Sequence, residues 1–360
     1  MSHLFAPLAL RSIEVPNRIG IPPMCQYSAE DGMASDWHFV HYGSRAVGGA
    51  GLIIVEATAV VPEGRISPAD LGLWNDAQIE PLARLAGFMK RQGSVPAIQL
   101  GHAGRKAGVG KGWEAQRALE DAAGGWTPVA PSAVAFGEGY RLPEALDSEG
   151  LRDIVRHFAA STRRALEAGF EAVEIHAAHG YLLHQFLSPL ANRRTDAYGG
   201  NFENRTRLLR EVVTAVRAEW PDALPLLIRL SATDWIEGGW TVEETVELCR
   251  WLKGNGIDLV DVSSGGMSPA AVIPAGPGFQ TGFAARVRAE AGIATAAVGL
   301  ITSAQQADHI VRSGQADLVL VGREILRQPQ WPLTAAQALG VSVNWPAQYL
   351  RAAPAGTSMR

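Results

Sequence analysis

The sequence has few cysteines, no long apolar run and no block of charge of one sign. Cys25 and Cys249 are the only cysteines in 360 residues, so they provide neither a disulfide framework nor a metal or iron–sulfur cluster. No segment approaches the roughly 20 apolar residues of a membrane span. Lys and Arg number 32 against 36 Asp and Glu, for a net charge of −4, which gives no electrostatic reason to bind nucleic acid. We therefore expect no membrane partner and no nucleic-acid partner.

The N-terminus also lacks a targeting signal. Met1–Leu10 has no basic stretch followed by a long apolar one, so we predict no signal peptide. Together with the sparse cysteines, this favours a reducing, cytoplasmic location. Hydrophobic residues make up 47% of the chain, which is enough for one large core.

Eight short apolar runs alternate with longer amphipathic segments. The runs are almost continuously apolar, as parallel strands covered on both faces should be. Eight strand–helix units predict an α/β fold, a closed (β/α)₈ TIM barrel formed as a single domain by residues 1–360. The predicted strands are Arg18–Pro22, Gly51–Thr58, Val95–His102, Ala172–His179, Leu224–Ser231, Asp258–Ser263, Ala294–Leu300 and Ala316–Val321. The predicted helices are Asp147–Ala168, Phe202–Glu219, Thr241–Gly254, Gly282–Ala291, Ser303–Ser313 and a terminal helix Thr334–Gly340 that is followed by an extended tail.

Two connections are too long for simple loops. Gly104–Leu146 is rich in glycine, proline and aromatic residues, and Tyr181–Gly200 carries the polar cluster Asn192–Asp196. Long excursions over a barrel mouth usually act as lids or substrate walls. We expect an N-terminal cap on the barrel and these two loops over its C-terminal face.

Polar or reactive residues stand where the predicted strands end. In this fold the active site lies at the C-terminal ends of the strands, so their concentration there is a functional signal. These residues are Met24, Cys25, Thr58, Gln99, His102, His176, His179, Arg229, Ser263, Gly299, Gly322 and Arg323.

The last two strands end in residues suited to phosphate. Gly299 and Gly322 permit close approach of a ligand to the backbone, and Arg323 offers a charged fork. The loops after the last two strands of such barrels often bind phosphate. The alternative is a pair of glycine turns beside an ordinary surface arginine.

Two other polar residues lie within apolar strands. Gln99 can donate and accept at once, either to a neighbour in the core or to the polar edge of a ligand. Arg229 requires an anionic partner if it is buried. That partner is either a ligand or an internal carboxylate, for example Glu56 or Glu174.

His176 and His179 are followed directly by Tyr181. A histidine pair can bind a metal, but no third carboxylate or histidine falls at an obvious ligand spacing, so we expect no metal site. The two cysteines also have a simple structural interpretation. Each could be a small buried apolar residue, and Cys249 within a predicted helix is assigned to the core.

Five motifs in order resemble the old yellow enzyme family. They span the chain from about Leu4 to Trp331, and together they are highly specific. Cys25, Tyr27 and the terminal Pro346–Arg351 resemble its bacterial thermophilic-like branch, which includes the xenobiotic reductases. The motifs are Arg18–Tyr27, Glu56–Thr58 with Gln99–Arg105, Glu174–Leu182, Asn192–Gly200, and Gly322 with Arg323.

The resemblance implies non-covalent FMN. Gln99 would face the flavin pyrimidine edge, Arg229 the N1 and O2 atoms, and Cys25 the N5 atom, where it tunes the redox potential. The full set of cofactor-binding residues that we expect is Pro23, Met24, Cys25, Ala57, Gln99, Arg229, Ser263, Gly299, Gly322 and Arg323.

The resemblance also implies an ene-reductase that uses NADPH or NADH. His176 and His179 would hold the substrate's carbonyl or nitro oxygen, Tyr27 would contact the same oxygen, and Tyr181 would donate a proton to Cα. Arg351 would reach into the site of a neighbouring subunit in a homodimer or homotetramer, with residues 335–360 at the interface. Substrates would be α,β-unsaturated carbonyl or nitro compounds.

A dinucleotide-binding fingerprint is missing. The glycine-rich run Gly108–Gly112 neither follows a strand-to-helix turn nor has the required spacing. Nicotinamide should therefore use the substrate's site, with ping-pong kinetics. Three other readings stay open: a flavin barrel with an iron–sulfur cluster, which the two isolated cysteines disfavour; a metal-dependent or Schiff-base lyase; and a phosphate-binding barrel without activity.

Overall fold

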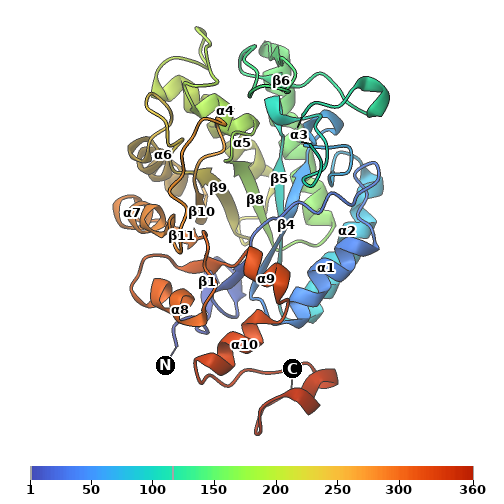
Figure 1. Cartoon of the computed structure of the whole chain (residues 1–360), viewed down its shortest axis with the longest axis vertical. Helices are drawn as coiled ribbons and strands as arrows, with labels where there is room; N and C mark the ends of the chain where they lie inside the picture. Colours follow the sequence, from blue (N-terminus) through green and yellow to red (C-terminus); the bar gives the residue numbers. More distant parts are fainter. Residues whose placement is uncertain (1, 116, 360) are drawn as a thin grey trace.

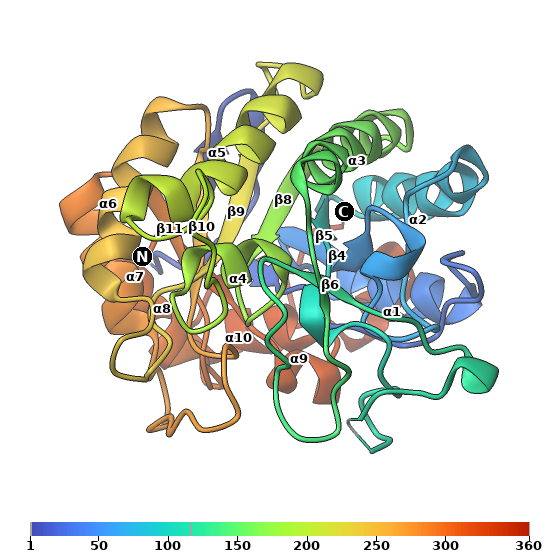
Figure 2. The ribbon, with the colours of Figure 1, turned by 90° about the horizontal axis from the view of Figure 1, so that it is seen from above.

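A closed barrel of eight parallel strands forms the centre of the molecule. The computed structural model describes residues 2–115 and 117–359, so the two ends of the predicted 1–360 domain, at residues 1 and 360, lie outside it. Helices surround the barrel on its outer side (Figures 1 and 2), which confirms the (β/α)₈ fold. The strand order around the barrel is β10-β11-β12-β3-β4-β5-β8-β9. The strands are β3 Ile19–Ile21, β4 Leu52–Ala59, β5 Val95–Gly101, β8 Ala172–Ala177, β9 Leu226–Ser231, β10 Leu259–Ser263, β11 Ala294–Ala297 and β12 Leu318–Leu320.

All eight predicted strands are present, most of them with trimmed ends. β8 ends at Ala177 rather than His179, and β11 at Ala297 rather than Leu300. The reason is local, because His179 has φ +57°, and Gly299 and Leu300 have φ +128° and +51°. Extended strands require negative φ. The residues at these two ends are therefore in turns that project side chains over the barrel mouth.

The helices follow their capping signals. Asp147 accepts from the backbone N–H groups of Glu149 and Gly150 at the start of α3, and Thr241 and Glu244 form a capping box at the start of α6. Cys249 is fully buried within α6, as predicted. The barrel helices are α1 Asp36–Val47, α2 Ile79–Arg91, α3 Ser148–Glu167, α5 Phe202–Glu219, α6 Val242–Gly254, α7 Thr281–Ala291 and α8 Ala304–Arg312.

The C-terminal helices differ from the prediction in two respects. α9, Arg323–Arg327, was not predicted, and α10 spans Trp331–Ala338 rather than Thr334–Gly340. Pro332 lies in the first turn of α10, where its missing N–H is not needed, so the helix can start earlier. After α10 the chain reaches away from the barrel (Figure 1) and forms the short helix η5, Ala347–Ala352, before the last described residues.

A hairpin closes the N-terminal end of the barrel. Strands β1 Leu8–Leu10 and β2 Ile13–Val15 pair antiparallel. Leu8, Leu10 and Val15 share one buried cluster with residues at the beginnings of the barrel strands, such as Leu52 and Val95. This hairpin confirms the predicted N-terminal cap.

The two long excursions pack together at one end of the barrel (Figure 1). The first contains the short strands β6 Val129–Ala130 and β7 Glu144–Ala145, and the second contains the helix α4, Leu182–Leu187. The polar cluster of the second loop joins them, because the Arg194 guanidinium donates to the carbonyl oxygens of Pro131 and Leu146 at 3.0 and 2.6 Å. Within residues 2–115 and 117–359, no helix is long and apolar enough to cross a membrane.

Candidate active site

A cavity of about 370 Å³ lies at the carboxyl ends of the later barrel strands, a volume in the range of small-molecule sites. Seven of the ten predicted cofactor-binding residues line it. Ala57 lines a much smaller cavity beside it, together with His176 and Tyr181. The seven residues are Pro23, Met24, Arg229, Ser263, Gly299, Gly322 and Arg323.

One wall of this cavity is suited to an anion. A Cβ atom on Gly299 would lie 3.1 Å from both the Gln280 amide and the Phe279 ring, so the backbone here approaches the cavity as only glycine allows. Arg323 is exposed at the cavity wall, and it forms no ion pair with any residue that the structure describes. A cation without a carboxylate partner is available to a phosphate group.

Arg229 has an internal partner, but the partner is not one of the two carboxylates named from sequence. Arg229 Nε lies 2.8 Å from Asp261 Oδ2, and both side chains are buried. The strands β9 and β10 pair so that these two residues are directly adjacent. Glu174 lies near enough for Arg229 to lower its pKa, although burial raises that pKa more. The expectation of Glu56 or Glu174 as the partner is therefore corrected to Asp261.

Gln99 already has a partner within the barrel. Its Nε2 donates to Glu174 Oε1 at 2.8 Å, and both residues are buried. This contact matches one of the two interpretations that the sequence left open, in which Gln99 is an amide bonded to a neighbour in the core. The role of Gln99 at the flavin edge stays a prediction.

His176, His179 and Tyr181 come together at the end of β8. The ring centroids of His176 and His179 are 5.3 Å apart, and those of His176 and Tyr181 are 4.9 Å apart. His179 Nε2 lies 2.7 Å from the hydroxyl oxygen of Ser263, and Ser263 also lines the large cavity. The predicted catalytic cluster is thus contiguous with the predicted cofactor cavity.

Both imidazoles are neutral hydrogen-bonding groups. Burial, followed by the positive charge of Arg229, lowers the pKa of His176 and of His179 well below the usual value. The Ala178 N–H donates to His176 Nδ1 at 3.3 Å, so the proton of that ring is on Nε2 and can be donated. His176 can therefore donate to an anionic oxygen without itself carrying charge.

Tyr181 is a neutral phenol in this environment, because burial raises its pKa well above the usual range. Lys106 Nζ lies 4.9 Å from the Tyr181 ring centroid and donates to the carbonyl oxygen of His179 at 2.9 Å. Burial, followed by Arg105, lowers the pKa of Lys106 to about 8. Lys106 therefore contacts the backbone of the predicted catalytic turn.

Cys25 and Tyr27 pack against an apolar cluster that Tyr181 also contacts, which is formed by Ile66, Ala103, Ala107 and Val109. Burial raises the pKa of the Cys25 thiol, and Asp70 and Glu56 add to the rise, so the sulfur is a protonated thiol. Tyr27 has φ +50°, and its ring packs edge-on against Trp113 with centroids 5.7 Å apart. Trp113 is itself 68% exposed, which places it at the rim.

Arg351 does not belong to this group of site residues. It is exposed in η5, where it shares a surface pocket with Tyr349 and Trp345. It does not line the cavity of its own chain. Its action in a neighbouring subunit stays a prediction.

Comparisons with known proteins agree with this geometry. The model of the NADH:flavin oxidoreductase / NADH oxidase family matches residues 3–341. The NADPH dehydrogenase of Bacillus licheniformis is 49% identical over 351 residues, which cover 97% of this chain and 98% of that protein. The chain belongs to the NADH:flavin oxidoreductase / NADH oxidase family.

Two solved structures support the assignment of fold and family. Morphinone reductase superposes with a TM-score of 0.78 at 30% identity, covering 96% of this chain and 91% of that one. An old yellow enzyme homologue from Zymomonas mobilis superposes with a TM-score of 0.79 at 26% identity, covering 95% and 94%. This family member is therefore an oxidoreductase that acts with NAD(P)H and uses FMN.

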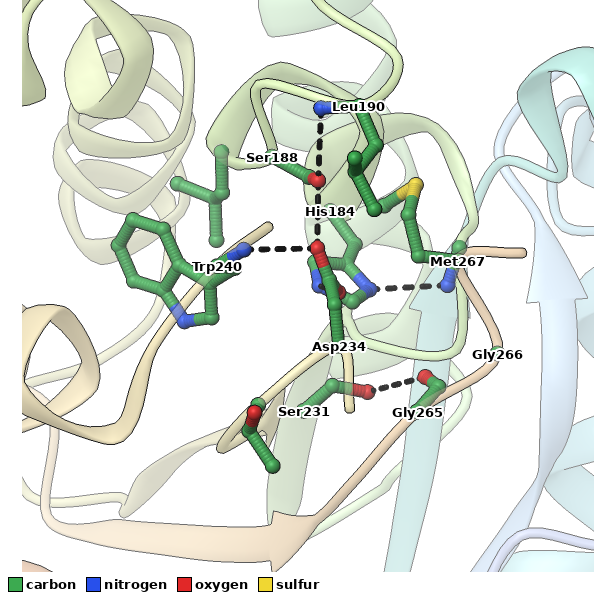
Figure 3. A network of polar contacts seen from close by, with 12 residues as sticks. His184, Ser188, Leu190, Ser231, Asp234, Trp240, Gly265, Gly266 and Met267 are labelled. Carbon is green, nitrogen blue, oxygen red and sulfur yellow. Dashed lines mark hydrogen bonds and ion pairs between the residues drawn. The ribbon is translucent and has the colours of Figure 1, made fainter. Parts of the chain in front are cut away.

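Several residues of the site were missed from sequence. Ser231 and His184 accept from backbone N–H groups of the turn between His179 and Tyr181. Asp234 lies behind His184, 3.0 Å from its Nε2 atom (Figure 3). Asp261 could have been recognised from the sequence as a partner of Arg229, since it is a carboxylate in an apolar strand beside the strand of Arg229. His184 and Asp234 had none, because each lies beyond a strand end and only the fold brings them together.

Proposed function

We propose that this chain is an ene-reductase, which reduces the C=C bond of α,β-unsaturated carbonyl and nitro compounds with NADPH or NADH as reductant. The proposal is supported by the contact between the imidazole–phenol cluster and the cavity for the cofactor. Ser263 belongs to both, since it lines the cavity and lies 2.7 Å from His179.

The residues of the large cavity, together with Ala57 and Gln99, fit non-covalent FMN. Gly299, Gly322 and Arg323 would hold the phosphate, while Pro23, Met24 and Ala57 would lie along the ring system. Gln99 and Arg229 would serve its pyrimidine edge, where Arg229 would stabilise negative charge. When bound, FMN supplies the hydride that it accepts from NAD(P)H.

His176 and His179 would bind the substrate's carbonyl or nitro oxygen. Negative charge grows on this oxygen as hydride reaches Cβ, and neutral donors fixed beforehand stabilise it without reorganisation. His176 has its proton on Nε2 and a low pKa, so it acts as a donor throughout the working pH range. Tyr27 is a third candidate to contact the same oxygen.

Tyr181 would deliver a proton to Cα on the face opposite the flavin, so that net addition is trans. A phenol is a suitable acid here because the carbon that it meets is strongly basic. The raised pKa of Tyr181 keeps the proton on the phenol until that carbon needs it. Cys25 would lie near the flavin N5 atom and tune the redox potential as a thiol.

Nicotinamide and substrate would use this site in turn, with ping-pong kinetics. A homodimer or homotetramer would bring Arg351 of one subunit to the site of another, with residues 335–360 at the interface. The exposed tail that carries Arg351 (Figure 1) is consistent with that arrangement.

The test is turnover with product analysis. The purified protein should be yellow, should release intact FMN on denaturation and should oxidise NADPH in the presence of 2-cyclohexenone, with cyclohexanone as the product. Loss of the C=C bond with the carbonyl intact is the expected result. Cyclohexenol as the product, or no consumption of enone by FMN-loaded protein, would contradict the proposal.

A further inference from the structure

The turn between Ala178 and Tyr181 is closed by the Tyr181 N–H, which donates to the Ala178 carbonyl oxygen at 3.1 Å, and its two central residues, His179 and Gly180, are held by side chains. His179 and Gly180 both have positive φ, +57° and +71°, so this is a left-handed turn that a strand or helix cannot stabilise. A Cβ on Gly180 would lie 2.1 Å from the carbonyl oxygen of Gly266. The turn therefore needs glycine here and needs partners for its own polar atoms.

Each of its four backbone polar atoms meets a side chain. The His179 N–H donates to Ser231 Oγ at 2.9 Å, and the His179 carbonyl accepts from Lys106 Nζ at 2.9 Å. The Gly180 N–H donates to His184 Nδ1 at 2.9 Å, and the Gly180 carbonyl accepts from Gln185 Nε2 at 2.7 Å. Removing one of these partners leaves a buried backbone group unsatisfied.

The His184 contact has a further layer behind it (Figure 3). His184 Nε2 lies 3.0 Å from Asp234 Oδ1, and both side chains have no exposed surface. Asp234 Oδ2 accepts from the Ser188 hydroxyl at 2.5 Å and from the Trp240 N–H at 2.8 Å. Burial alone would raise the pKa of Asp234, but His184, Ser188 and the Trp240 N–H together hold it below the usual value. Asp234 is therefore a carboxylate.

This arrangement fixes the tautomer of His184. A carboxylate at Nε2 requires the ring proton on that nitrogen, which leaves Nδ1 free to accept from Gly180. With the opposite tautomer, an N–H would face the Gly180 N–H and the contact would be lost. The state of Asp234 thus decides whether the turn is held.

We propose that His184 and Asp234 form a positioning couple that holds the His179–Gly180 turn and thereby aims His179 and Tyr181 at the substrate. Neither residue of the couple touches the reacting atoms. The inference rests on the proposed function, because it assigns the couple a role in aligning the groups that bind and protonate the substrate. A small displacement of such groups lowers rates steeply, by about 100-fold for about 1 Å.

The test uses FMN-loaded protein with three variants of the couple. His184→Leu removes both polar contacts at similar volume. Asp234→Asn either places an amide N–H against His184, which disfavours the required tautomer, or places it against the Trp240 N–H, which loses that contact and loosens the couple. His184→Asn keeps an acceptor at the position of Nδ1, so it should restore the Gly180 contact. The control is His41→Leu, which removes another buried imidazole, on α1 and outside the site.

The first measurement does not need turnover. Hydrogen–deuterium exchange of the peptide that contains Gly180 should accelerate about tenfold or more in His184→Leu and Asp234→Asn. It should return toward the wild-type rate in His184→Asn and stay unchanged in His41→Leu. The Ser231→Ala variant removes a different partner of the same turn and serves as a positive control for the exchange readout, and if His184→Leu fails to fold, Asp234→Asn still tests the couple.

The second measurement is titration with p-chlorophenol, followed by the long-wavelength absorption of the flavin–phenolate complex. We expect affinity to fall about tenfold and re-oxidation by 2-cyclohexenone to slow about 100-fold in His184→Leu, with recovery in His184→Asn. Wild-type exchange and wild-type phenol affinity in His184→Leu would overturn the positioning role. If wild-type protein binds no phenol and reduces no enone, the proposed function fails, and the exchange of Gly180 still decides whether the couple holds the turn.

Discussion

Replacing Tyr181 with phenylalanine should separate the two half-reactions of the enzyme. The contacts of Tyr181 with His176 and Lys106 are made by its ring, at 4.9 Å in both cases, so the variant should fold and bind FMN normally. It loses only the hydroxyl that would protonate Cα. A positioned general acid contributes about 10²–10⁴-fold, which corresponds to about 3–5 kcal/mol in the barrier.

The assay is anaerobic stopped-flow absorbance of the flavin. Reduction by NADPH should be nearly unchanged, and re-oxidation by 2-cyclohexenone should slow by at least about 100-fold. Because burial raises the pKa of Tyr181 well above the usual range, the ratio of wild-type to variant rates should stay constant between about pH 6 and 9. The matched control is Tyr140→Phe, since Tyr140 and Tyr181 pack against the same apolar cluster of Ile66, Ala103, Ala107 and Val109. Equal slowing of both half-reactions, or none, would refute the role of Tyr181 as the acid.

Three further predictions concern the cofactor cavity and its buried charges. Arg323→Met should weaken FMN binding about 10–100-fold in an apoprotein titration, as expected for one charge-assisted contact; an unchanged Kd would remove Arg323 from the phosphate site. Asp261→Asn should lower the free energy of unfolding by about 3–5 kcal/mol in urea, because it leaves Arg229 buried without its carboxylate, and the double variant Arg229→Met/Asp261→Leu should recover much of that loss. A double variant less stable than Asp261→Asn would contradict this explanation. Burial lowers the pKa of Lys106 from 10.5 to about 8, so charged Lys106 destabilises the fold below that pH and the penalty disappears as pH rises to 10.5. The stability of wild type relative to Lys106→Met should therefore increase by about 3 kcal/mol between those pH values, and a constant difference would contradict the lowered pKa.

The barrel could be predicted from the sequence because each of its strands is a short, local run of apolar residues. All eight runs became strands of one closed sheet, and glycine or capping residues marked most helix ends. The start of α10 was predicted too late. The prediction began the helix at Thr334, whereas Pro332 is compatible with the first turn of a helix and permits an earlier start. Helix α4 was missed because its residues Leu182–Leu187 are all buried and show no amphipathic period.

The candidate site could be predicted where chemistry follows directly from strand ends. Seven predicted residues share one cavity, and His176, His179 and Tyr181 cluster beside it. Partners across the barrel could not be predicted in the same way. Whether Arg229 pairs with Glu174 or with Asp261 depends on strand register. A shift of one residue in the register turns every side chain of a strand to the opposite face of the sheet. The contact of His184 with Asp234 depends on how two loops meet above the barrel.

The central claim is that His176 and His179 bind an anionic oxygen beside the flavin. A crystal structure of the FMN-loaded protein with p-hydroxybenzaldehyde tests it most directly, because a phenolate imitates the charged oxygen of the activated substrate. We predict the phenolate oxygen within hydrogen-bonding distance of a ring nitrogen of each histidine, with the aromatic ring stacked on the flavin. A ligand held elsewhere in the barrel mouth, with both imidazoles bonded only to protein groups, would contradict the account.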